Sequence, residues 1–152
     1  MSDGKVDKTS FALMGVSMRR LVSAAETGGA FSLFENSSEA PTRTPVHVHR
    51  DDDETLYVLE GEMQAIVAGK TRTVRAGEAV FLPRGVPHQL VNETGLRARY
   101  LLLCTPGVFE AFLEDAGQLL AVGESAPAPT IDDVQRLKAV APAHGITLLP
   151  GW

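Results

Sequence analysis

The chain has 152 residues, of which 44% are hydrophobic and 22% charged, a composition typical of one globular domain and not of a disordered, fibrous or membrane protein. Lys and Arg number 14 against 19 Asp and Glu, so the net charge is −5, which argues against a nucleic-acid partner because such binders carry a basic face. No apolar run approaches a membrane span and charged residues precede the first apolar stretch, so we expect no signal peptide and no membrane partner. The single cysteine, Cys104, cannot form an internal disulfide, so a cytoplasmic location is the default expectation.

Residues 1–9 are expected to be a flexible N-terminus. The apolar segment 11–16 predicts either a core strand or a strand exchanged between two copies of the chain. Short apolar runs separated by Gly, Pro and charged turns then predict strands at 31–34, 55–59, 63–67, 71–74, 79–82 and 97–104. Many short strands at even spacing favour a β-sandwich or barrel.

Residues 105–152 are richer in Ala and Pro and predict helices. Thr105 followed by Pro106 predicts a helix N-terminus. Four apolar residues then follow the spacing of one helix face: Phe109, Phe112, Leu113 and Ala116. Thr130 predicts the cap of a second helix, which we expect Pro142 to end.

Three of the four histidines fall in two short stretches. His47 and His49 are two residues apart, so on a strand their side chains share a face. His88 follows a tight turn, and its ring is expected to reach the pair only if the two strands face each other across a barrel. The acidic run that ends at Glu54 is by default a solvated turn, and His144 has no such neighbours.

The spacing of these residues resembles the two motifs of the cupin superfamily. The first motif, G-x5-H-x-H-x3–4-E-x6-G, is matched by His47, His49, Glu54 and Gly61. The second motif, G-x5-P-x-G-x2-H-x3-N, is matched by Gly77, Pro83, Gly85, His88 and Asn92. The leading glycine of the first motif is replaced by Pro41, a departure that affects a turn and not a ligand.

The resemblance implies an all-β fold, a double-stranded β-helix or jelly-roll cupin barrel with a short C-terminal helical extension. We expect the barrel at residues 10–104 and the extension at 105–152, packed on the barrel. In cupins the matching residues bind one metal ion, so the resemblance implies the ligands His47, His49, Glu54 and His88. Imidazole and carboxylate suit divalent iron, manganese, nickel, cobalt, copper or zinc, and affinity alone does not choose among them.

Side-chain parity predicts the surroundings of this site. Leu56, Val58 and Leu90 are candidates for an apolar pocket wall, provided that no β-bulge intervenes. Cys104 is expected to be a buried packing residue and Asn92 to brace a strand end. Five large side chains are expected in the core: Phe31, Phe34, Met63, Phe81 and Tyr100.

The run from His47 to Gly61 also resembles single-domain bacterial cupins similar to quercetin 2,3-dioxygenase. This resemblance implies a metal-dependent dioxygenase, an oxidoreductase that acts with dioxygen on a small phenolic or enolic, flavonol-like substrate. The ion would act as a Lewis acid on the substrate, and Glu54 would be the catalytic residue that takes the substrate proton. Small cupins further imply a homodimer.

Whether the chain is an enzyme stays open, because fold and metal do not choose a reaction. The alternative is a non-redox isomerase or epimerase, or a protein that only binds a small molecule. A phosphosugar enzyme needs Lys or Arg in its pocket, whereas Lys70 and Arg72 share one face of a strand that we expect to be exposed.

Overall fold

The computed structural model describes residues 9–39, 41–121 and 123–150, so the predicted flexible N-terminus lies outside the described residues except for Thr9. Two antiparallel sheets make up most of the described structure. The first sheet contains, in spatial order, β12 (Gln118–Leu120), β1 (Ser10–Leu13), β2 (Val16–Val22), β3 (Ser32–Ser38), β11 (Ala98–Thr105), β6 (Asp53–Glu60) and β9 (Ala79–Leu82). The second contains β13 (Ile146–Leu149), β5 (Val46–His49), β10 (His88–Asn92), β7 (Glu62–Val67) and β8 (Lys70–Arg75), with β4 (Thr42–Arg43) paired to β10.

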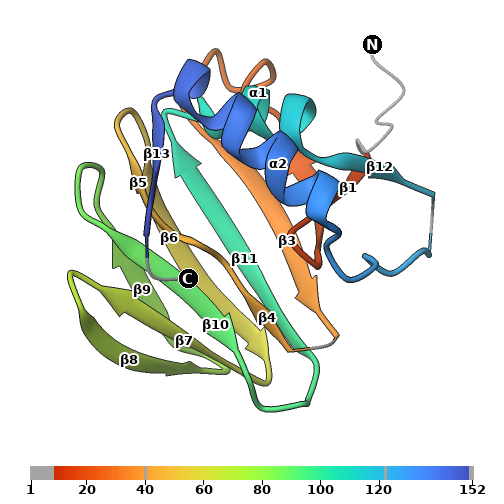
Figure 1. The fold of residues 1–152 in the computed structure, drawn as a ribbon. Coiled ribbons are helices and arrows are strands. Elements are labelled where there is room, and N and C mark those ends of the chain that lie inside the picture. Colours follow the sequence, from red (N-terminus) through yellow and green to blue (C-terminus); the bar gives the residue numbers. More distant parts are fainter. Residues whose placement is uncertain (1–8, 40, 122, 151–152) are drawn as a thin grey trace, which may run out of the picture.

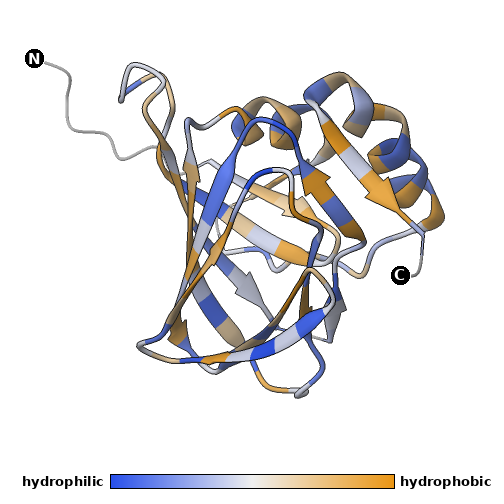
Figure 2. Ribbon diagram, turned by 90° about the vertical axis from the view of Figure 1, so that its left-hand side faces the viewer, coloured by the Kyte–Doolittle hydropathy of each residue, from blue (hydrophilic) through white to orange (hydrophobic). Residues whose placement is uncertain are grey.

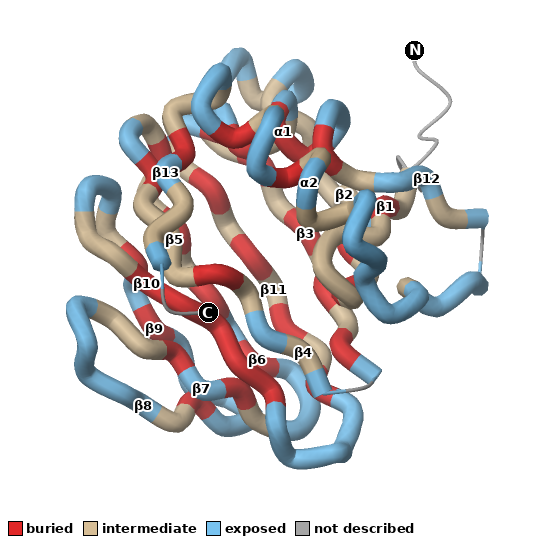
Figure 3. The backbone as a smooth tube through the Cα atoms, in the orientation of Figure 1, coloured by how far each residue is buried: buried red, intermediate tan, exposed pale blue. Residues whose placement is uncertain are grey.

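The two sheets face each other, which confirms the predicted all-β jelly-roll fold (Figure 1). The buried hydrophobic residues form two clusters. Buried residues gather on the strands between the sheets, whereas the turns are exposed (Figure 3). Hydrophobic and hydrophilic residues alternate along several strands, the pattern of a sheet with one face on a core (Figure 2). All six predicted strands of the barrel are present, each within four residues of its predicted limits.

The N-terminal apolar segment forms two strands, not one. Met14 and Gly15 have positive φ angles of 49° and 82° and turn the chain between β1 and β2. Phe11 and Val16 are buried, and β1 pairs with β2 and β12 of its own chain. In this structure the segment is therefore a core strand, β1, followed by a turn and the first residue of β2.

The prediction that the first helix starts at Thr105 is wrong. Thr105 is the last residue of β11, and α1 runs from Phe109 to Ala116. The reason is a tertiary cap: the carboxylate of Asp52 accepts hydrogen bonds from the backbone N–H groups of Gly107 and Val108, both at 3.1 Å, and of Phe109 at 2.5 Å.

The rest of the C-terminal segment mixes helices and strands. The second helix, α2 (Ile131–Val140), starts with the predicted cap at Thr130, whose side chain accepts from the backbone N–H of Asp133. Pro142 lies in a 3-10 turn, η1 (Ala141–His144). Both β12 and β13 also lie in this segment, and each adds to the edge of one sheet. Sequence analysis assigned this segment to helices and loops and predicted neither strand.

The core predictions hold for most of the side chains named. Phe34, Met63, Tyr100 and Cys104 are buried. The prediction that Phe81 lies in the core is wrong. Its neighbours on β9, Val80 and Leu82, point inward, so Phe81 points outward and is 57% exposed. In the described part of the chain, no helix is long and apolar enough to cross a membrane.

Candidate metal centre

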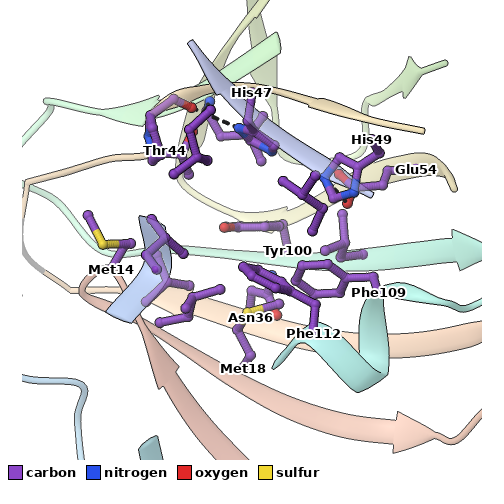
Figure 4. Close-up of a pocket in the computed structure, with 18 residues that line it drawn as sticks. Met14, Met18, Asn36, Thr44, His47, His49, Glu54, Tyr100, Phe109 and Phe112 are labelled. Atoms are coloured by element: carbon purple, nitrogen blue, oxygen red, sulfur yellow. Dashed lines mark hydrogen bonds and ion pairs between the residues drawn. The ribbon is translucent and has the colours of Figure 1, made fainter. Parts of the chain in front are cut away.

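The two histidines of the first motif lie on β5 and point to the same side, as their spacing predicts (Figure 4). β5 pairs with both β13 and β10, and the register places His88 directly opposite His47. His88 therefore reaches the pair as a neighbour in the same sheet. The expectation that it must face the pair across the barrel is wrong.

Glu54 comes from the opposite sheet, where it is buried on β6. Its Oε1 atom is 3.1 Å from Nε2 of His49, and its Oε2 atom is 3.5 Å from Nε2 of His88. The structure thus brings all four residues of the predicted ligand set together between the two sheets.

The three imidazoles form one compact group. Their ring centroids are 4.3 Å apart for His47 and His88, 5.0 Å for His47 and His49, and 5.5 Å for His49 and His88. One ligand nitrogen from each lies within 4.8 Å of the other two. Two nitrogens bound to one ion at about 2.1 Å are at most about 4.2 Å apart, so small side-chain shifts let the three share an ion. The three histidines could therefore bind a metal, with Glu54 beside them.

Several ring nitrogens of this group lack a hydrogen-bond partner. Among the described residues, Nε2 of His49 and both ring nitrogens of His88 are buried without a hydrogen bond of normal geometry. Buried polar atoms in this condition are costly, and a divalent ion would satisfy one nitrogen of each ring. The residues present therefore fit a metal, and imidazoles with one carboxylate suit a transition metal.

His47 is held in the form that binds a metal. Its Nδ1 atom lies 2.7 Å from the carbonyl oxygen of Pro45 and donates to it, which leaves the Nε2 lone pair free for an ion. Burial, reinforced by the neighbouring His88 and His49, lowers the pKa of His47 to about 3. The ring is therefore neutral at neutral pH.

Glu54 is ionised at neutral pH. Burial acts to raise its pKa, but the neighbouring imidazoles of His49 and His88 outweigh burial and lower the pKa to about 2. A carboxylate is the form that can both ligate a metal and accept a proton.

The turn and strand residues of the second motif brace the site. Gly85 has a φ angle of 76°, and its N–H donates to the carbonyl oxygen of His49 at 2.8 Å. The amide of Asn92 donates to the carbonyl of Leu96 at 2.9 Å and accepts from the Thr94 hydroxyl at 2.8 Å. Asn92 therefore braces the end of β10, as predicted.

A cavity of about 80 Å³ adjoins the imidazoles (Figure 4). Its walls come largely from outside the two motifs, and the principal apolar wall residues are Leu13, Met14, Val16, Met18, Leu90, Leu102, Phe109, Phe112, Leu137, Ile146 and Leu148. Leu90 lines it as predicted, whereas Leu56 and Val58 are buried in the core below and do not. No Lys or Arg is among the described residues that line it.

Sequence analysis missed the contribution of the C-terminal segment to this cavity. Phe109 packs against His49, with ring centroids 5.7 Å apart, and Phe112 lies next to it on α1. Both residues belong to the helix face that the apolar spacing revealed, but the spacing alone did not show what this face covers.

Comparison with known proteins finds a family similar to the segment that holds this site. Residues 38–104 match the family described as Cupin domain, the segment that holds all four site residues. Over this segment the chain is similar to the cupin superfamily. This agrees with the motif resemblance and with the double sheet of the structure.

The proteins to which this chain is similar differ in what their names describe. The tetracenomycin polyketide synthase protein TcmJ of Streptomyces glaucescens is 28% identical over 93 residues, which is 60% of this chain and 62% of that protein. Quercetin 2,3-dioxygenase of Bacillus subtilis is 28% identical over 68 residues, 45% of this chain and only 20% of that enzyme. A sugar phosphate isomerase structure from Silicibacter pomeroyi is 27% identical with a TM-score of 0.51, and the match covers 60% of this chain and 59% of that one.

Proposed function

We propose that this cupin is a metal-dependent dioxygenase that acts on a small phenolic or enolic substrate. The observation that carries the proposal is the group of three imidazoles with Glu54 at the side of a largely apolar cavity. The similarity to quercetin 2,3-dioxygenase over 68 residues supports it. A bound transition metal supplies Lewis-acid polarisation of a substrate oxygen in such a site.

The chain's own residues have distinct roles in this proposal. Glu54 accepts the proton of the substrate hydroxyl, and the imidazoles of His47, His49 and His88 hold the ion. Phe109 and Phe112 keep bulk water away from the imidazoles because their rings cover that side of the cavity.

The cavity favours substrates smaller than a three-ring flavonol. Its volume of about 80 Å³ is below the roughly 150 Å³ of a cavity that holds benzene, so even a single ring requires the lining side chains to move. Met14 and Met18 line the cavity, and their unbranched side chains adjust to a ligand more easily than branched ones do.

The isomerase alternative has a specific observation against its phosphosugar form. A phosphorylated sugar needs a cationic partner, and the described lining residues include no Lys or Arg. Lys70 and Arg72 lie on the exposed strand β8, as predicted, and Arg84 is paired with Asp53 at 3.1 Å.

Oxygen uptake tests the proposal directly. Protein loaded with each candidate metal is mixed with one-ring phenols, enols and flavonols under an oxygen electrode, and we expect uptake with at least one small substrate. Glu54→Gln should abolish turnover and retain part of the metal, since the amide keeps one oxygen but cannot take a proton. Metal binding without any oxygen uptake would favour a non-redox or purely binding role, and full activity of E54Q would remove the role of Glu54.

A further inference from the structure

Three polar side chains line the cavity besides the metal-site cluster: Asn36, Thr44 and Tyr100. The hydroxyl of Thr44 is already engaged, because it accepts a hydrogen bond from the backbone N–H of Leu90 at 3.0 Å. Asn36 and Tyr100 are cross-strand partners on β3 and β11, and both point inward from the first sheet. They form a polar pair in an otherwise apolar wall.

The pair presents one hydroxyl donor to the cavity. The side-chain amide of Asn36 donates to the phenolic oxygen of Tyr100, so the hydroxyl hydrogen of Tyr100 is directed elsewhere. Figure 4 shows the Tyr100 ring between the imidazoles and Asn36, with its hydroxyl toward the middle of the cavity. Burial raises the pKa of Tyr100 to about 12, so the hydroxyl keeps its proton. The Oδ1 atom of Asn36 is also buried without a partner among the described residues.

We propose that Tyr100, positioned by Asn36, binds a second oxygen atom of the ligand, separate from the oxygen that lies at the imidazoles. The ligand class is then a one-ring phenol or enol with two oxygen groups that are too far apart to bind one ion together. This inference rests on the proposed function. A buried donor aimed into an apolar cavity discriminates strongly, because a ligand without the matching oxygen leaves the donor unpaired.

The test uses Co²⁺-loaded protein and three probes: phenol, resorcinol and hydroquinone. Binding is followed by the visible spectrum of the Co²⁺ ion. We expect at least one dihydroxybenzene to bind about tenfold more tightly than phenol, the size of one good hydrogen bond. Tyr100→Phe removes only the hydroxyl, so it should abolish this preference, and phenol affinity should stay the same or rise because no donor is then left unpaired.

Two further variants separate positioning from general damage. Tyr57, the other tyrosine of the chain, is 41% exposed outside the barrel. Tyr57→Phe is therefore the matched control and should keep the preference for a dihydroxybenzene. Asn36→Leu frees the Tyr100 hydroxyl to rotate and should reduce the ratio of dihydroxybenzene affinity to phenol affinity. Cobalt content and melting temperature are measured for every variant.

The outcomes distinguish a failure of the proposed metal site from a failure of the Tyr100 subsite alone. Protein that takes up no Co²⁺ overturns the proposed metal site and this subsite with it. If Co²⁺ binds but wild-type protein binds no probe or shows no preference for a dihydroxybenzene, only the subsite is overturned. If Y100F retains the full preference for a dihydroxybenzene, the subsite is likewise overturned. If N36L retains it, the positioning role of Asn36 is overturned.

Discussion

At the scale of single residues, the acidic run before the metal site shows what a motif can and cannot reveal. Asp51 lies beside Arg50 at the surface, and Asp53 pairs with Arg84. Asp52 is 2% exposed and caps α1, more than 50 residues away in sequence. The motif identified Glu54 by its spacing, but nothing local distinguishes a buried capping aspartate from its solvated neighbours.

The role of Asp52 leads to a stability prediction. Asp52→Ala leaves three N–H groups at the start of α1 without their acceptor, so we expect a loss of about 2–3 kcal/mol in the free energy of unfolding. Urea unfolding measures this loss in the free energy of unfolding. Asp51→Ala is the control and should have little effect, since Asp51 is paired only at the surface. Equal losses in the two variants would contradict the capping role.

At the scale of elements, strands were predictable where apolar periodicity and turn residues agree. β6, β7, β8 and β9 are separated by such turns and were found close to their limits. What periodicity could not supply is which strands become neighbours. The site depends on β5 pairing with β10, a pairing between segments about 40 residues apart, and on β6 facing them from the other sheet.

Gly61, between β6 and β7, shows how a motif glycine fixes one of these turns. Its φ angle is 76°, and a Cβ atom there would lie 2.4 Å from the carbonyl oxygen of Arg97. Gly69 has a similar φ of 79° but open space around it. Gly69→Ala should therefore cost only the left-handed backbone penalty of about 1–2 kcal/mol, and Gly61→Ala at least about 1 kcal/mol more, in urea unfolding. A G61A variant as stable as G69A would refute the role of close packing.

At the scale of the whole molecule, the C-terminal segment is part of the site and not only a cover for the barrel. Side chains of α1, α2 and β13 enclose the cavity beside the imidazoles. Sequence analysis expected this segment to pack on the barrel, yet its contact with the site depends on tertiary geometry that neither motif encodes. The division into barrel and extension stays a prediction.

The homodimer also stays a prediction, and the outer face of the first sheet is where we expect it. Tyr57, Leu59 and Phe81 are exposed there, although an uncovered sheet face is normally polar. Arg99 is neutralised by Glu35 and Glu60 on the same face, so charge does not oppose a second copy. Light scattering after size exclusion should show a dimer.

The double variant Y57K/F81K should shift this protein to monomer, because it places charges in the expected interface. Leu119→Lys changes an equally apolar side chain, 74% exposed on β12, and should leave the dimer intact. A wild-type monomer, or a double variant that remains dimeric, would exclude this face as the interface.

The central claim, a metal bound by the histidine cluster, is tested most directly by elemental analysis of the purified protein and two variants. After incubation with the candidate divalent ions and gel filtration, we expect one transition-metal ion per chain in the wild type. His144→Ala should retain it, because His144 pairs with Asp115 outside the cluster. The double variant H49A/H88A should retain almost none. A wild-type protein that binds none of these ions, or a double variant that binds as much metal as the wild type, would contradict the account.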